Sequence, residues 1–327
     1  MRKTLDEKLA RIAADSACKD FILADAKDAD MAYGLAAPGV KRVPQDGQSP
    51  FHSVQDYRAN IRSIVEQQLV DIMLMSVNTS DALADRERLF DNSPITPAIR
   101  SNDTSDLWLY GTDAQYGKQP SMPFRTAILD EVLTQPNVNL GLYSVTFNND
   151  TAVDHATLSA YRAFREEAWR KGFRHFLEVF PPNAPLNPVK DVPRFVNDSI
   201  VRLLAGAGSA TRPLFLKIPY FGPAAMDQLA SYDSSLVVGI LGGSAGTSFD
   251  AFQMLWEAKK YGARVALFGR KINTAEHQLS FVEQLRALAD GNTVPAEAVK
   301  AYHGALQKLG IKPVRALAED SQPQTAA

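Results

Sequence analysis

The stretch at residues 236–272 constrains the fold most, because it joins two buried apolar runs through one amphipathic helix. Each run ends in a glycine-bearing turn, first at 242–244 and then at 269–270. A strand–helix–strand unit of this kind is typical of a parallel sheet or barrel. Glycine lets backbone N–H groups approach an anion closely, and a helix N-terminus adds favourable partial charge. We therefore expect a phosphate cradle built from Gly242, Gly243, Ser244, Gly269 and Arg270.

The rest of the chain repeats this alternation. Besides the two strands within 236–272, we expect strands at 21–26, 71–76, 95–99, 140–147, 175–180 and 213–220. Helical periodicity is found at 54–68, 124–135, 153–171, 192–208, 274–290 and 296–309, and a long polar loop at 101–123. No G-x-G-x-x-G follows the first strand, which argues against a dinucleotide-binding sheet. We predict an α/β fold: a single (β/α)8 TIM barrel over residues 1–317 with an N-terminal helical extension, and a disordered tail at 318–327.

The composition excludes several kinds of protein. The net charge is -2 and no basic cluster is interleaved with aromatic residues, so we expect no nucleic-acid partner. One cysteine, Cys18, and five histidines without ligand spacing argue against a disulfide framework and a metal site. No apolar run is long enough to cross a membrane, and the first residues lack a signal-peptide core. We expect a cytoplasmic homo-oligomer that acts on a small molecule without a cofactor.

Lys217 lies in an apolar strand, where a buried cation is costly. Strand alternation places Phe215 and Lys217 on one face and the continuous apolar side chains on the other, so we expect Lys217 to face the barrel lumen. Catalytic side chains of such barrels stand at the carboxyl ends of strands. A desolvated lysine amine can attack a carbonyl group. The alternative is a lysine whose head only reaches solvent or a carboxylate.

Glu178, on the preceding strand, shares a face with Phe176 and Phe180. If that face is the lumen, Glu178 neighbours Lys217 and can move protons during attack on a carbonyl. The alternative is an ion pair that only satisfies both charges.

Asp25 is the third candidate, at the end of the first strand, where a carboxylate can bind a substrate hydroxyl. Its alternative role is to cap a helix or to face solvent. Lys27 is a rival for the reactive amine, but its polar neighbours offer no desolvation.

Two segments carry a resemblance to a known family. LFLKIPYFG, around Lys217, and GILGGSAGTSFDAFQMLWEAKKYGARVALFGRKI are similar to the last third of class I (Schiff-base) aldolases, of the tagatose-bisphosphate and archaeal-type fructose-bisphosphate kinds. The resemblance implies a (β/α)8 barrel without metal and a reactive lysine at Lys217. It implies phosphate turns at 242–244 and 269–270. Glu178 matches the acid/base glutamate of the tagatose type, and Asp25 the aspartate that follows the first strand.

The middle of the chain departs from that family. The tagatose type carries a second lysine on strand four, where this chain has LGLYSVTFN, and Tyr143 or Ser144 takes its place in the site. The archaeal type has a tyrosine on strand five, where Glu178 and Phe180 stand here. The loop at 101–123 has no counterpart.

These observations predict a class I aldolase-like carbon–carbon lyase that acts on a phosphorylated ketose through a lysine Schiff base. The alternative is a barrel that keeps the phosphate cradle but has no aldolase activity and serves a binding or regulatory role. A metal-dependent barrel lyase is a third hypothesis, which sensitivity to a chelator would test.

Overall fold

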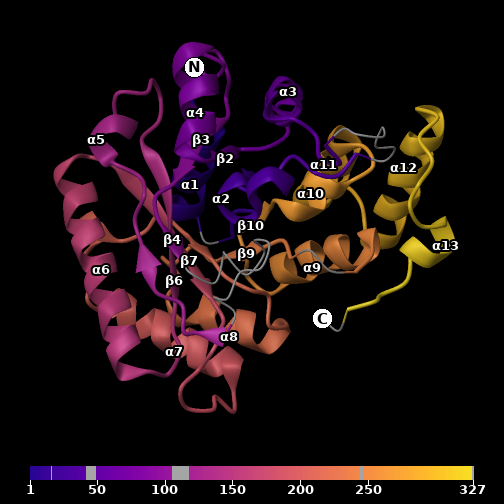
Figure 1. Ribbon diagram of the computed structural model, residues 1–327. Helices are drawn as coiled ribbons and strands as arrows, with labels where there is room; N and C mark the ends of the chain where they lie inside the picture. Colours follow the sequence, from indigo (N-terminus) through magenta and orange to yellow (C-terminus); the bar gives the residue numbers. More distant parts are fainter. Residues whose placement is uncertain (16, 42–48, 105–117, 244–245, 326–327) are drawn as a thin grey trace.

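The computed structural model describes residues 1–15, 17–41, 49–104, 118–243 and 246–325, and its centre is a barrel of eight parallel strands (Figure 1). Around the barrel the strand order is β8-β7-β6-β3-β2-β1-β10-β9. The strands are β1 Ile22–Lys27, β2 Ile72–Met75, β3 Thr96–Arg100, β6 Leu140–Thr146, β7 Arg174–Phe180, β8 Leu216–Lys217, β9 Gly239–Leu241 and β10 Val265–Phe268. The predicted (β/α)8 TIM barrel is confirmed.

Backbone hydrogen bonds between β8 and β9 close the barrel. Leu216 N–H donates to the carbonyl of Val237 at 2.9 Å, and Ile218 N–H donates to that of Gly239 at 3.0 Å. Ile218 and Ile240 form a parallel bridge just beyond β8. Strand β8 is shorter than the predicted 213–220 at both ends, and its early end fits Pro219, which has no N–H to donate.

Helices surround the barrel (Figure 1). They are α1 Thr4–Ala14, α2 Asp30–Tyr33, α3 Val54–Gln67, α4 Val77–Ser80, α5 Leu129–Val132, α6 Thr151–Arg170, α7 Val192–Ala205, α8 Pro223–Tyr232, α9 Ser248–Lys260, α10 Arg270–Thr274, α11 Gln278–Asp290, α12 Pro295–Lys308 and α13 Leu317–Asp320. Alternate strand residues face two separate cores. Leu23, Met73 and Val145 pack with the helices, whereas Ile22, Leu74 and Phe176 fill the lumen.

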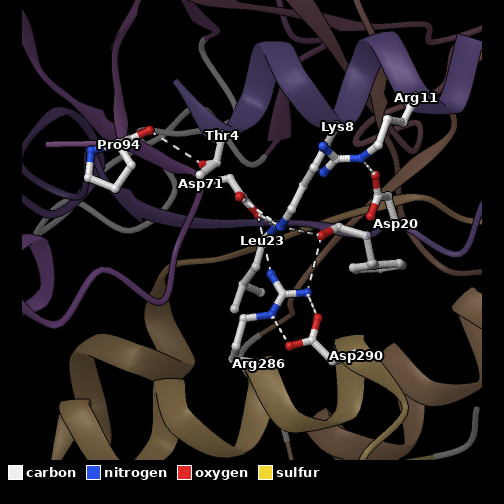
Figure 2. Close-up of polar contacts among 10 residues, drawn as sticks. Thr4, Lys8, Arg11, Asp20, Leu23, Asp71, Pro94, Arg286 and Asp290 are labelled. Carbon is white, nitrogen blue, oxygen red and sulfur yellow. Dashed lines mark hydrogen bonds and ion pairs between the residues drawn. The ribbon is translucent and has the colours of Figure 1, made fainter. Parts of the chain in front are cut away.

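Helix α1, the predicted N-terminal extension, covers the amino end of the barrel. Leu5 is fully buried in the same cluster as the lumen side chains. Figure 2 shows how polar contacts fasten this helix: Lys8 Nζ lies 2.8 Å from an Asp71 carboxylate oxygen. Asp71 also accepts a hydrogen bond from Leu23 N–H at 2.8 Å and one from Arg286 of α11 at 3.3 Å. Substrate access from this end is therefore blocked, and the site belongs at the carboxyl end.

The structure differs from the sequence predictions in three segments. The helix predicted at 124–135 is only α5, because Pro123–Phe124 (β5) pairs antiparallel with Asp103–Thr104 (β4). The helix predicted at 274–290 begins at Gln278. Most of the predicted 101–123 loop, residues 105–117, lies outside the described residues.

The third difference is at the tail, residues 318–327, which was predicted to be disordered. Its first residues belong to α13, and Asp320 is buried. An Asp320 carboxylate oxygen accepts a hydrogen bond from Ser248 N–H at 2.8 Å, and the other lies 2.9 Å from His303 Nε2. Gln324 N–H donates to Asp250 at 3.1 Å. These contacts tie the described part of the tail to the start of α9, so the prediction does not hold there.

Candidate active site

A cavity of about 130 Å³ lies at the carboxyl end of the barrel. The ends of the strands and the turns after them form its walls. It is lined by Ala26, Asp28, Ala29, Ala32, Tyr33, Arg100, Glu178, Phe180, Lys217, Leu241, Gly242, Gly243, Leu267, Gly269 and Arg270. The structure therefore brings together six of the eight residues singled out from the sequence.

Lys217 and Glu178 form the centre of the cavity. They are aligned partners on β8 and β7, and Lys217 Nζ lies 2.6 Å from Glu178 Oε1. The two residues are 7% and 2% exposed. Beneath them, the rings of Phe176 and Phe215 stack at 4.6 Å. The predicted orientation of both charged side chains toward the lumen is confirmed, and the apolar floor keeps them from bulk water.

Ser144 and Arg100 both contact the second carboxylate oxygen of Glu178. Ser144 Oγ donates to Glu178 Oε2 at 2.7 Å, and Arg100 Nη2 donates to Ser144 Oγ at 2.8 Å. The same Arg100 nitrogen is 3.3 Å from Glu178 Oε2. Of the two strand-four candidates, Ser144 lies in the site, whereas Tyr143 faces outward and stacks on Phe164 at 4.5 Å.

Asp28 is the carboxylate that β1 delivers to the cavity, on the turn just after the strand. Arg100 Nη1 donates to Asp28 Oδ2 at 2.7 Å. Burial alone would raise the pKa of Asp28, but the positive charges of Arg100 and Lys217 outweigh it and lower the pKa. Asp28 is thus held as an anion beside Lys217.

Asp25 lies on the other face of β1, away from the cavity. Its Oδ2 is 3.5 Å from Lys27 Nζ, and both side chains are completely buried. Lys27 also donates to Gln278 Oε1 at 2.8 Å. Burial raises the pKa of Asp25 to about 6, although the nearby Lys27 opposes the shift. The structure does not bring Asp25 to the other predicted residues, and it places Asp28 there instead.

The sequence carried a signal for Asp28. Ala24 and Ala26 face the lumen, and the same alternation continues to Asp28. Arg100 continues the alternation from Ala98 in the same way. The predicted third strand stopped at residue 99, one position before this arginine.

The two glycine turns line the cavity on the side of β9 and β10. Gly243 has a φ of +48°, a conformation that side-chain-bearing residues rarely adopt. A Cβ on Gly269 would lie 2.7 Å from the carbonyl oxygen of Ala26, so only glycine fits there. Arg270 Nη1 is 3.4 Å from Tyr33 Oη. The N–H of Gly242 donates to the carbonyl of Leu267 at 2.7 Å, so it is already used within the barrel. Ser244 lies outside the described residues.

Within the described ranges, no group of three or more His, Cys, Asp or Glu side chains is arranged to hold a metal ion. In the same part of the chain, no helix is long and apolar enough to cross a membrane.

Comparison with known proteins finds similarity in structure. No family model and no curated sequence matches the chain. An archaeal fructose 1,6-bisphosphate aldolase superposes with a TM-score of 0.63 at 15% identity, covering 88% of this chain and 100% of that one. An archaeal enzyme solved with its catalytic lysine covalently bound to a carbinolamine intermediate gives 0.62 at 16% identity, covering 88% and 100%. The fructose-bisphosphate aldolase from Slackia heliotrinireducens gives 0.64 at 15% identity, covering 91% of each chain.

The likeness is one of fold. The resemblance to archaeal-type aldolases inferred from the sequence is confirmed at that level.

Proposed function

We propose that this protein is a class I aldolase-like lyase that breaks or forms a carbon–carbon bond in a phosphorylated ketose through a Schiff base on Lys217. The observation that carries the proposal is the buried contact of 2.6 Å between Lys217 Nζ and Glu178 Oε1 at the carboxyl end of the barrel. A nucleophile and a proton acceptor at hydrogen-bond distance in a buried position are what amine catalysis requires. The fold shared with Schiff-base aldolases supports the proposal.

Formation of the Schiff base needs three proton movements. Lys217 passes a proton to Glu178 Oε1, and the free amine attacks the ketose carbonyl carbon. A proton then moves from the attacking nitrogen to the new alkoxide oxygen, which gives a carbinolamine. Glu178 returns the proton to the carbinolamine hydroxyl, which leaves as water while the nitrogen lone pair forms the iminium. One proton shuttle therefore serves both attack and dehydration.

The iminium then accepts the electron pair of the breaking carbon–carbon bond and becomes an enamine. The hydroxyl on the neighbouring fragment loses its proton to Glu178, which is a carboxylate again after dehydration, and becomes the carbonyl of the released aldehyde. Glu178 returns this proton to the enamine carbon, and water then hydrolyses the resulting iminium and frees Lys217. Asp28, next to Lys217 and held as an anion, takes the hydroxyl-binding role that the sequence had suggested for Asp25.

The substrate phosphate is assigned to the turns at Gly243, Gly269 and Arg270, on the β9–β10 side of the cavity. Binding energy from this remote group would hold the carbonyl carbon against Lys217.

Borohydride reduction tests the proposal. The protein would be incubated with a panel of ketose phosphates, including fructose 1,6-bisphosphate and dihydroxyacetone phosphate, reduced, and weighed intact by mass spectrometry. We expect one added substrate mass, which peptide mapping places on Lys217. Phosphate-dependent binding without any trapped adduct would instead favour a binding barrel without aldolase activity. Activity that a chelator removes would favour a metal-dependent lyase.

A further inference from the structure

Arg100 forms ion pairs with both carboxylates of the cavity, Asp28 and Glu178. It ends β3 and is only 3% exposed. One terminal nitrogen donates to Asp28 at 2.7 Å, and the other donates to Ser144 at 2.8 Å. Its Nε donates to the carbonyl of Asn102 at 3.0 Å. This guanidinium therefore joins the two carboxylates of the cavity while its own position is fixed by the backbone.

Four charged side chains at the centre of the cavity, apart from Arg270 of the second glycine turn, form two close pairs that are joined by the contact of 3.3 Å between Arg100 and Glu178. Lys217 lies against Glu178, and Arg100 lies against Asp28. A guanidinium does not lose its proton in proteins, whereas an ammonium can. When Lys217 passes its proton to Glu178, that pair becomes neutral and the pair of Arg100 and Asp28 stays ionised. The net charge of these four groups thus stays zero through the proton transfer, which avoids leaving an unpaired buried ion among them.

The hydrogen bonds also select one oxygen of Glu178. Arg100 donates to Ser144 Oγ, so the single hydroxyl hydrogen of Ser144 is directed to Glu178 Oε2. Oε1 keeps Lys217 as its neighbour at 2.6 Å. Asn102 fixes Ser144 in turn, since its side chain accepts from Ser144 N–H at 2.6 Å and donates to the Ser144 carbonyl at 2.8 Å.

We propose that Arg100 is a positioning residue, which through Ser144 directs Glu178 Oε1 to Lys217 and keeps Asp28 ionised beside the reacting amine. This inference rests on the proposed function, because it assigns a role in the same reaction. Arg100 contacts Glu178 Oε2 at 3.3 Å and Asp28 at 2.7 Å, so its effect on the amine passes through these carboxylates and Ser144.

The matched variants are Arg100→Gln, Arg100→Lys and Ser144→Ala, each compared with the wild type by borohydride trapping and by the pH profile of kcat/KM. Arg100→Gln should slow trapping by about a hundredfold, the usual size of an acid–base contribution. Its acid limb should move to higher pH, because the carboxylates lose a neighbouring cation. Arg100→Lys should return the acid limb of the pH profile to its wild-type position but should not restore the trapping rate. Ser144→Ala should lower the rate and leave the limb in place.

A second measurement does not depend on activity. Carboxyl ¹³C NMR would follow the titration of Asp28, assigned with Asp28→Asn, in the wild type and in Arg100→Gln. Besides Arg100 and Lys217, the groups coupled to this carboxylate include Asp25, Asp30, Asp103 and Tyr57, and Glu178 and Arg270 line the same cavity. None of these other residues is substituted in either protein. The pKa of Asp28 should rise in Arg100→Gln and return in Arg100→Lys.

The outcomes separate the two proposals. Absence of trapping in the wild type with every ketose phosphate would refute the proposed function, and with it the role of Arg100 in catalysis. Trapping in the wild type together with an unmoved acid limb and an unmoved Asp28 titration in Arg100→Gln would refute the positioning role alone. If circular dichroism shows that Arg100→Gln does not fold, the test uses Arg100→Lys instead. A wild-type trapping rate in Arg100→Lys would then overturn the positioning role.

Discussion

Strand β1 and its following turn contribute to two buried charge clusters, one on each side of the barrel wall. On the lumen side, Asp28 is bonded to Arg100 at 2.7 Å, and the cluster continues to Glu178 and Lys217. On the helix side, Asp25 and Lys27 are separated by 3.5 Å, and neither carboxylate oxygen of Asp25 has a hydrogen-bond partner among the described residues. Both clusters contain a lysine and an aspartate. The hydrogen bonds around them, and the cavity beside one of them, distinguish a site from a structural pair.

The largest expected effect distinguishes the two lysines. Lys217→Arg keeps the positive charge but cannot form an iminium, so turnover should be abolished while the fold is kept. Aldol cleavage measured by a coupled assay, with borohydride trapping beside it, checks this. The matched control is the trapped wild type, in which peptide mapping should find the adduct on Lys217 and none on Lys27. An active Lys217→Arg protein would mean that the amine mechanism is wrong.

Substitutions in the helix-side pair, Asp25 and Lys27, should change the stability of the protein. Lys27→Met leaves the Asp25 carboxylate buried without its counter-charge and should lower the free energy of unfolding by about 3–5 kcal/mol at pH 7. The double variant Asp25→Val with Lys27→Met replaces both charges by apolar groups and should recover the loss. Urea unfolding measures both. The double variant should also keep its aldolase activity, and a loss of activity in a stable double variant would return Asp25 to the active site.

Substitutions of the two lumen carboxylates, Glu178 and Asp28, should change the reaction rate. Glu178→Gln removes the proton acceptor of Lys217 and should slow turnover by about a hundredfold or more, while slow trapping persists. Asp28→Asn should also lower kcat/KM, because the hydroxyl of the substrate loses its anionic partner. Steady-state kinetics on both variants provides the measurement. If Asp28→Asn kept wild-type kinetics, the cavity would bind its substrate without this carboxylate.

The two clusters also predict a pH dependence. The pKa of Asp25 is about 6 in the folded protein, against an ordinary value of 3.8, so between about pH 4 and 6 the folded state binds a proton that the unfolded state has lost. Stability from this group therefore falls as pH rises through that window, by up to about 3 kcal/mol. Urea unfolding of the wild type and of the apolar double variant should diverge in this sense, because the double variant lacks the group. A difference that does not change with pH would contradict the burial effect.

The smallest effect concerns the phosphate turn. Gly243→Val puts a β-branched side chain at a φ of +48° and into the space beside the cavity. KM for a phosphorylated substrate should rise, with little change in kcat and little change for the unphosphorylated analogue. An equal change for both substrates would show that the turn is only structural.

Much of the barrel was predictable because strand alternation and helical periodicity are local. The meeting of Lys217 and Glu178 followed from alternation on two neighbouring strands. Asp25 was misplaced because a side chain one position along a strand points to the opposite face. Asp28 lies two positions beyond the predicted first strand, and Arg100 lies one position beyond the predicted third strand. The short α5 could not be foreseen from its helical pattern, because the pairing of β4 with β5 joins segments far apart in the chain.

The contact of β1 with β10 has a consequence for synthesis of the chain. β1 needs a paired strand on each side, and one of these two strands, β10, begins only at Val265. The hydrogen bond from Arg286 to Asp71 likewise forms only after α11 has been synthesised. A nascent chain thus carries β1 with one open edge until most of the polypeptide has left the ribosome, and open strand edges invite pairing with other chains. Closing contacts between residues so distant in sequence also slows folding. The barrel's first strand is therefore among the last to be completed, although it is the first to be synthesised.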